Sequence, residues 1–248
     1  MSDPIELIHA EETLKSGWLA PGKKCEALEK ELSELSGHKK AIVVNSKASA
    51  EFLGMISCGI TKGSEVIVVD PLVEPIYLKI LEESIHAIVK HQFISAENIL
   101  EFIPSLTKII TPNTQALILG DFTLYETQIN LTEIKEHYPN LQIISNFPIN
   151  HSKVINQIAS ISIVEISDIC SVVLFSDEKV YQRAIGIRDW GRVGTQSENV
   201  SDRYSGWILG NGVRYDYKFV YGDLGFNFKT CDLAASLALD YLHKFHSN

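Results

Sequence analysis

The stretch that decides the fold opens with Arg188-Asp189-Trp190-Gly191-Arg192 and ends in the apolar run from Leu233 to Leu239. Two further motifs lie between, Tyr215-Asp216-Tyr217-Lys218-Phe219 and Gly225-Phe226-Asn227-Phe228-Lys229. Aromatic, charged and glycine residues mix there without a helical or strand period, which predicts one long connection over 188–232. Long connections inside a compact domain are usually functional or disordered. The aromatic content argues against disorder, because it would leave too much apolar surface in water.

The bulk composition is that of an ordinary globular chain, with 248 residues, 45% of them hydrophobic and 21% charged. This length suits a single domain over 1–248. A net charge of -9 and the absence of a basic stripe argue against nucleic-acid binding. The four cysteines have no paired spacing, which favours reduced thiols and a cytoplasmic location over a zinc or disulfide framework. No signal peptide or membrane-spanning run is expected.

Short apolar runs alternate with helical patterns along the chain. We expect strands at 41–44, 65–69, 87–89, 116–119, 141–144 and 172–175, and helices at 25–36, from 48, from 75, at 131–138, 177–187 and 233–245. This alternation predicts an α/β fold, a three-layer domain with a mostly parallel sheet and right-handed crossovers. Ligands in such sheets bind beyond the carboxyl ends of the strands.

The three motifs of the 188–232 stretch, in this order and spacing, resemble the DegT/DnrJ-type nucleotide-sugar aminotransferases. They are nearest the branch of 3-dehydrases that act on CDP-4-keto-6-deoxyglucose. Ser16-Gly17-Trp18-Leu19, followed by Gly22 and a Leu/Glu-rich helix, resembles the family's opening. The resemblance implies the large domain of fold-type I pyridoxal phosphate enzymes, with the small C-terminal domain absent because the chain stops at Asn248. It also implies a link to nucleotide-deoxysugar and lipopolysaccharide or surface polysaccharide biosynthesis.

The resemblance implies a cofactor-binding phosphate cradle at Asn45-Ser46-Lys47-Ala48-Ser49. A strand-turn-helix junction presents free backbone N–H groups and a positive helix end, which suit a phosphate. Ser46 and Ser49 would donate to it, and Lys47 would add positive charge. The alternative is an ordinary serine-capped helix. The turn after the second strand, Asp70 to Pro75, has no aromatic residue that could stack on the cofactor.

The family's catalytic positions are altered or missing. Asn146 stands where an Asp should pair with the pyridinium nitrogen, and an amide cannot supply that negative charge. The family's Schiff-base lysine, or the histidine of the 3-dehydrase branch, lies on a segment between two strands. Here we expect the first of these strands to begin at Asp168 and to continue directly into Val172-Val173-Leu174-Phe175. That segment is therefore deleted, and we expect no catalytic residue and no bound cofactor.

Asn227 matches the Asn that reaches across the family's dimer to the phosphate of the neighbouring subunit. The resemblance thus implies a homodimer with the 188–232 connection at its interface, or a mixed dimer with a full-length homologue. The alternative for Asn227 is a turn in the left-handed region, which Asn tolerates. The eight histidines show no spacing that predicts a metal site.

Three interpretations of function remain open at this point. The first is a degenerate family member that binds a nucleotide sugar or acts as a partner subunit. The second is an active sugar aminotransferase or dehydratase with a noncovalently held cofactor. The third is a binding or scaffold protein unrelated to sugars.

Overall fold

The computed structural model describes residues 7–72, 75–95, 98–120, 131–148, 159–193, 207–208, 211–216 and 219–246. Its centre is a seven-stranded sheet in the order β1-β7-β6-β5-β4-β2-β3. The strands are β1 (Lys40–Val44), β2 (Glu65–Asp70), β3 (Ile88–Phe93), β4 (Thr114–Leu119), β5 (Gln142–Pro148), β6 (Ile161–Ser167) and β7 (Cys170–Phe175). β7 runs antiparallel to both of its neighbours, and the other pairs are parallel. The predicted α/β fold with a mostly parallel sheet is confirmed.

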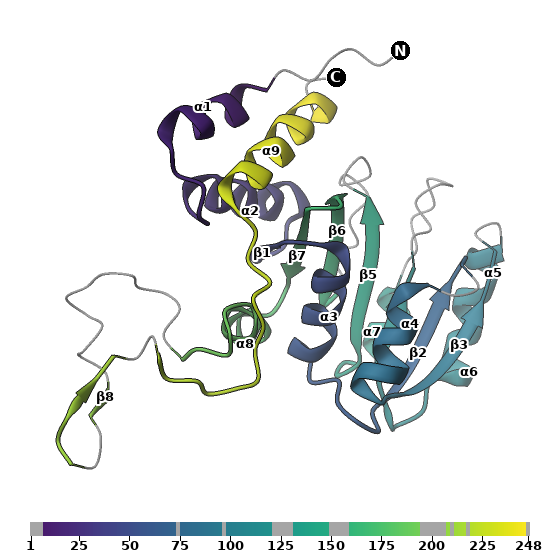
Figure 1. The fold of residues 1–248 in the computed structure, drawn as a ribbon. Helices are drawn as coiled ribbons and strands as arrows, with labels where there is room; N and C mark the ends of the chain where they lie inside the picture. The colour runs from purple at the N-terminus through teal and green to yellow at the C-terminus, as the bar shows by residue number, and fades with distance from the viewer. Residues whose placement is uncertain are drawn as a thin grey trace.

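Helices cover both faces of the sheet (Figure 1). They are α1 (Ile8–Ser16), α2 (Lys23–Ser36), α3 (Lys47–Ser57), α4 (Ile76–Lys79), α5 (Ile99–Phe102), α6 (Leu106–Ile109), α7 (Thr132–His137), α8 (Glu178–Arg188) and α9 (Asp232–His246). A π-helical segment (Ile80–Ile85) continues α4, and a 3-10 turn (Ile103–Ser105) joins α5 to α6. All the predicted strands and helices are present. α1, α5, α6, the strand β6 and a short two-stranded hairpin within 188–232 were not predicted.

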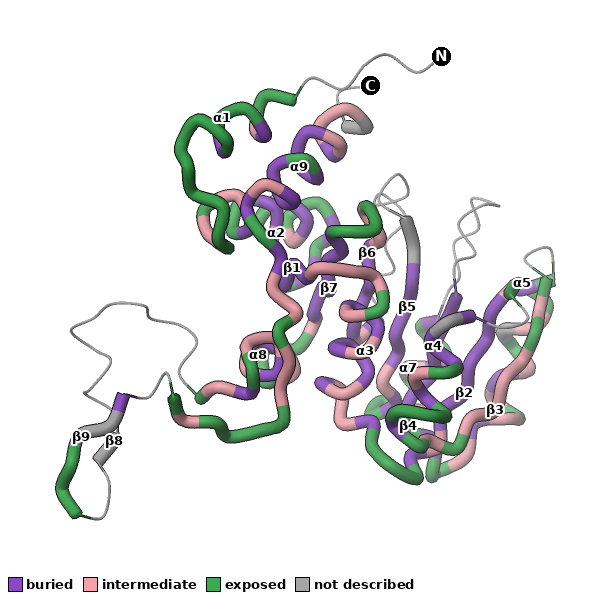
Figure 2. Tube along the Cα trace, in the orientation of Figure 1, coloured by how far each residue is buried: buried purple, intermediate pink, exposed green. Residues whose placement is uncertain are grey.

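Strand side chains alternate between the two faces, as period-2 geometry requires. Ile42, Val66 and Ile144 belong to the core under α3, α4 and α8. Their chain neighbours point to the opposite face, where Val43 packs with α2 and α9, and Ile67 and Ile143 pack with α5, α6 and α7. Apart from the edge strand β3, the strands of this sheet are buried along most of their described length (Figure 2). This explains why they appear in the sequence as continuous apolar runs.

The opening and closing motifs of the 188–232 stretch pair with each other. Trp190 N donates to Phe226 O (3.0 Å), and Phe226 N donates to Ile187 O (2.8 Å). Gly191 has φ +74°, and a Cβ on Gly225 would overlap the Gly191 backbone, so both glycines are required by the close approach. The Lys229 ammonium and the Arg192 guanidinium meet the Asp189 carboxylate at 2.8 and 3.2 Å.

The aromatic residues of this connection fall into two groups. Phe226 and Phe228 stack on each other and pack edge-on against Phe52 of α3. The side chains of Phe219 and Tyr221 are instead more than half exposed. A short hairpin, β8 (Trp207–Ile208) with β9 (Arg214–Tyr215), lies within the connection. Residues 194–206, 209–210 and 217–218 lie outside the described residues.

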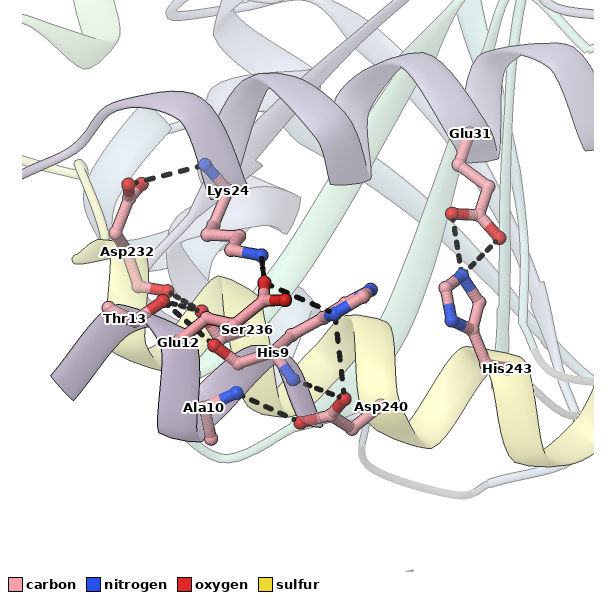
Figure 3. A network of polar contacts seen from close by, with 10 residues as sticks. All are labelled: His9, Ala10, Glu12, Thr13, Lys24, Glu31, Asp232, Ser236, Asp240 and His243. Atoms are coloured by element: carbon pink, nitrogen blue, oxygen red, sulfur yellow. Dashed lines mark hydrogen bonds and ion pairs between the residues drawn. The ribbon is translucent and has the colours of Figure 1, made fainter. Parts of the chain in front are cut away.

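Polar side chains of α9 hydrogen-bond to the first turns of α1 and α2 (Figure 3). The Asp232 carboxylate accepts hydrogen bonds from the backbone N–H groups of Gly22 (2.8 Å), Lys24 (3.2 Å) and Cys25 (3.1 Å), at the start of α2. The Asp240 carboxylate accepts those of His9 (2.9 Å) and Ala10 (3.1 Å) in the first turn of α1. Neither helix has a cap from its own preceding side chain. The two carboxylates supply that cap and a charge that suits the positive helix ends.

Candidate functional site

The first predicted site residues, Ser46 and Ser49, begin α3 at the carboxyl edge of the sheet. The Ser46 hydroxyl oxygen accepts the Ser49 N–H at 3.1 Å, and the Ser46 hydroxyl donates to Ser49 Oγ at 2.9 Å. The Ser49 hydroxyl donates to Asn45 Oδ1 at 2.7 Å. These hydroxyls therefore form the N-cap of α3 and bond to one another. Of the two interpretations of this junction, the geometry favours the serine-capped helix.

Asn227 lies beside this junction through its main chain. Its carbonyl accepts the Asn45 side-chain amide at 3.3 Å, and Asn45 N donates to the Phe228 carbonyl at 2.9 Å. Asn227 forms an antiparallel bridge with Asp189, and its side chain is exposed. Among the described non-glycine residues only His86 and Trp190 have positive φ. The left-handed turn predicted as the alternative for Asn227 is therefore wrong, because the residue is extended in a strand-like pair.

Lys47 points toward the sheet rather than toward a free anion cradle. Its ammonium lies 2.6 Å from Glu165 Oε2, and both side chains are about two-fifths exposed. Glu165 belongs to β6, the strand that the sequence prediction omitted. It shares the face of Ile161 and Ile163, which is the face that α3 covers. The positive charge offered by Lys47 is thus already matched by a carboxylate of the chain itself.

Glu51 lies four residues after Lys47, so it occupies the same side of α3 one turn further along. Its side chain is 1% exposed, and neither carboxylate oxygen has a hydrogen-bond partner. Burial raises the pKa of the Glu51 carboxyl to about 7, with Lys47 opposing that shift and Glu165 and Asp70 adding to it. An unpartnered buried carboxyl is costly when it is charged, so it holds its proton near neutral pH.

Asn146 lies within β5, two residues before its end, whereas the sequence placed it in the turn after the strand. It is 6% exposed, and neither its amide oxygen nor its amide nitrogen has a partner. Strand alternation puts it on the side of Ile144, which belongs to the core beneath α3. A buried polar side chain without partners is uncommon in native structures and calls for an explanation.

Asp70 ends β2 on the same face of the sheet and is also buried. The Tyr77 hydroxyl donates to its carboxylate, and the Leu72 N–H does so at 2.6 Å. A Cβ on Gly120 would overlap this carboxylate, so glycine at the end of β4 leaves room for it. The turn after β2, where a cofactor-stacking aromatic residue would be expected, therefore holds the Asp70 carboxylate. The nearby Tyr77 hydrogen-bonds to that carboxylate.

The connection between β6 and β7 is a turn of two residues, Asp168 and Ile169. The expectation that a strand begins at Asp168 is wrong, because Ser167 already pairs with Cys170 across this turn. The Thr230 hydroxyl closes over it by donating to the Ile169 carbonyl at 3.1 Å. The expected missing segment would belong in this hairpin. The first strand of the hairpin is β6, which was not predicted because the polar residues Ser162 and Glu165 interrupt its apolar pattern.

The residues of this edge do not fit pyridoxal phosphate. The hydroxyls at the start of α3 are bonded among themselves, and Lys47 is paired with Glu165. The β6–β7 turn has no lysine, and Lys179, the next in sequence, begins α8 at the opposite edge of the sheet. Lys153 lies outside the described residues. The nearby carboxylates of Glu51, Glu165 and Asp70 would oppose a phosphate rather than attract it.

Sequence reasoning missed Glu51, Glu165 and Asp70. The signal was present, because Glu51 interrupts the apolar inner side of α3 and Glu165 interrupts a β-branched run. Among the described residues, no group of three or more His, Cys, Asp or Glu could hold a metal ion. No described helix is long and apolar enough to cross a bilayer.

Comparison with known proteins agrees with this architecture. Residues 3–71 match the DegT/DnrJ/EryC1/StrS aminotransferase family. The spore coat polysaccharide biosynthesis protein SpsC of Bacillus subtilis (strain 168) is 36% identical over 115 residues, which are 46% of this chain and 28% of that protein. The match therefore spans less than a third of the curated relative's length.

Solved structures match over nearly the whole chain. The Escherichia coli GDP-4-keto-6-deoxy-D-mannose-3-dehydratase with bound hydrated PLP superposes with a TM-score of 0.78 at 17% identity, covering 99% of this chain and 66% of that one. The NtdA protein of Bacillus subtilis with bound cofactor PMP gives 0.71 at 17% identity, covering 98% and 53%. Identities this low show the fold alone. Together with the sequence matches, they confirm the predicted resemblance: the chain is similar to the DegT/DnrJ/EryC1/StrS aminotransferases over residues 3–71 and has the fold of these solved structures.

Proposed function

We propose that this chain is a degenerate member of the sugar aminotransferase and 3-dehydrase family that works without Schiff-base catalysis. Its setting would be nucleotide-sugar metabolism for a surface polysaccharide such as lipopolysaccharide, since the SpsC relative is a polysaccharide biosynthesis protein. Its ligand would be a nucleotide sugar, and its location the cytoplasm, where such sugars are made.

The observation that carries the proposal is the two-residue turn between β6 and β7. It leaves no lysine or histidine between Asp168 and Cys170. Asn146 adds to it, because an amide in the place of the expected acid cannot keep a pyridine nitrogen protonated. A cofactor held there would lack both its covalent anchor and its electron-sink partner.

Borohydride trapping tests this proposal. The purified chain is incubated with pyridoxal phosphate, reduced, digested and searched for a pyridoxyl-lysine peptide, with a lysine-dependent aminotransferase as the positive control. We expect background labelling spread over surface lysines. Stoichiometric labelling of one lysine would overturn the proposal and favour the active enzyme. Visible absorbance of bound cofactor without any labelled lysine would favour noncovalent binding.

We also propose a homodimer that buries the exposed part of the 188–232 connection. Phe219, Tyr221 and Leu224 are 53%, 56% and 73% exposed, and apolar surface of this kind often marks an interface. Light scattering at micromolar concentration should give twice the mass of the chain, about 55 kDa from 27.7 kDa per copy. A monomer at that concentration would contradict this part of the proposal.

A mixed dimer with a full-length homologue would explain Asn227. The contacts that Asn227 makes with the described residues are main-chain contacts, which other residues can also make. Its exposed side chain is therefore free to serve the phosphate site of a partner subunit. Co-expression with a homologue from the same genome, followed by cofactor titration, tests this directly. Asn227→Gly should weaken cofactor binding by the mixed species, and unchanged affinity or no mixed dimer would refute the idea.

A further inference from the structure

The carboxyl edge beneath α3 gathers polar side chains whose chemistry is opposite to that of a phosphate site. Glu51 comes from α3, Asn146 from β5 and Glu165 from β6, and strand alternation puts the two sheet residues on the face that α3 covers. Glu51 and Asn146 are 1% and 6% exposed, and no polar atom of either side chain has a hydrogen-bond partner among the residues that the structure describes. Two unpartnered, almost fully buried side chains, one from the helix and one from the sheet face that this helix covers, point to a binding role for this edge.

The acidic residues of this cluster favour a positively charged ligand group. Glu51, Glu165 and Asp70 are acidic, and Lys47 is the cation that acts on Glu51. A phosphate would meet two or three carboxyl groups there, whereas an ammonium would meet acceptors. Carboxylate and amide oxygens are hydrogen-bond acceptors, and a primary ammonium offers three donors.

The chain already shows that an ammonium suits this edge. The Lys47 ammonium lies 2.6 Å from Glu165 Oε2 at the half-exposed mouth of the cluster. Glu51 lies four residues further along α3, about 6 Å deeper. Because the Lys47–Glu165 pair is partly exposed, opening it should cost only about fivefold in an equilibrium constant.

We propose that this edge binds a ligand bearing a primary ammonium group, held by the carboxylates of Glu51 and Glu165 and by the Asn146 amide oxygen. The inference rests on the proposed function in one respect, namely that the family's anionic cofactor does not occupy this edge. The ammonium belongs either to an amino sugar or to a simple aliphatic amine. Its carrier would lie at the mouth, beside Lys47.

Isothermal titration of the full chain tests the proposal with four probes. Glucosamine and putrescine carry ammonium groups on a sugar and on an aliphatic chain. N-acetylglucosamine is the neutral match, and glucose 6-phosphate is the anionic one. We expect at least one amine to bind, with affinity at least about tenfold above the neutral and anionic sugars. Glucosamine ahead of putrescine identifies an amino sugar, and the reverse order identifies an aliphatic amine.

Variants locate the binding. Glu51→Gln should weaken amine binding by about ten- to a hundredfold, because a bound ammonium favours release of the Glu51 proton, and the amide cannot then supply the charge-assisted hydrogen bond. Glu82→Gln, a matched change at an exposed glutamate of the π-helical segment, should leave it unchanged. Glu165→Gln acts at the half-exposed mouth, where folding is not at risk, and should also weaken binding. Circular dichroism establishes that each variant is folded.

Three results would overturn the proposal: no amine binds, glucose 6-phosphate binds at least as well, or both Glu51→Gln and Glu165→Gln bind amines like the parent. None of these would affect the proposed absence of Schiff-base chemistry, which depends on the borohydride result. Conversely, a stoichiometric pyridoxyl-lysine peptide would overturn the proposed function whatever the amine titrations give.

Discussion

Two regions of this molecule bury acidic side chains in opposite ways. In the helical cluster of α1, α2 and α9, the buried carboxylates of Asp232 and Asp240 accept five backbone hydrogen bonds between them. At the carboxyl edge beneath α3, the equally buried Glu51 accepts none. The first arrangement stabilises the fold, because each carboxylate satisfies helix-end donors. The second costs stability, and such costs are commonly found where a protein binds or reacts.

The comparison predicts its largest effect at Asp232. Asp232→Ala leaves three N–H groups at the start of α2 without their acceptor, and we expect a loss of about 4 kcal/mol in the free energy of unfolding. Urea denaturation measures it. Asp223→Ala is the matched control, because that exposed carboxylate accepts one N–H, from its neighbour Leu224 at 2.8 Å, and meets Arg183 at 3.4 Å, so its loss should cost under about 1 kcal/mol. Equal losses in the two variants would contradict the capping role.

Substitution of Glu51 should have the opposite effect and raise the free energy of unfolding at neutral pH. The folded-state pKa of Glu51, about 7, lies above the ordinary glutamate value of 4.5, so the folded chain holds the proton more tightly than the unfolded chain. Stability is then fully present below pH 4.5 and falls as the pH rises to about 7, by roughly 3 kcal/mol. Glu51→Gln cannot ionise and should be more stable than the parent by that amount above this window. Denaturation over this pH range measures it, and a parent curve parallel to that of the variant would refute it.

A smaller loss is expected at Asp240. Asp240→Ala removes the acceptor of two N–H groups in α1, and we expect about 2 kcal/mol. Because α1 contacts α9 directly, hydrogen exchange should show faster exchange in α1 than in the parent, with the sheet unchanged. Uniformly faster exchange across the sheet would mean that α1 does not open as a local unit.

The smallest effect belongs to Lys47. Lys47→Met breaks an ion pair whose two side chains are 39% and 41% exposed, and such pairs contribute at most about 1 kcal/mol. Thermal unfolding should therefore shift by no more than a few degrees. A larger loss would mean that Lys47 is essential for balancing the buried Glu51.

The sequence predicted the fold well because its strands are nearly continuous apolar runs such as Val66 to Val69, which only burial on both faces explains. β6 was missed because Glu165 and Ser162 break its apolar pattern, and they do so because they face polar partners, Lys47 and Ser145. The order and spacing of the motifs revealed the family. They could not reveal that Trp190 and Phe226 belong to motifs that pair with each other across more than thirty residues.

The candidate site was predicted less completely. Ser46, Lys47, Ser49 and Asn146 do lie at the carboxyl edge, and the main chain of Asn227 borders it. The sequence could not tell whether the hydroxyls are free or bonded to one another, because this depends on side-chain rotamers. Glu51 does interrupt the apolar side of α3 in the sequence, but its burial was not predicted, since a single glutamate in an amphipathic helix normally faces solvent. Here the sheet on that side of α3 leaves no such exposure.

Direct titration of Glu51 tests the central claim that the carboxyl edge keeps an unpartnered acid in its neutral form. The full chain is labelled with ¹³C on the glutamate side chains, and the Glu51 carboxyl signal is assigned by its loss in Glu51→Gln. The account predicts a titration midpoint near pH 7, well above the ordinary glutamate value of 4.5. A midpoint at or below 4.5 would show that Glu51 is solvated or paired, and would contradict the account.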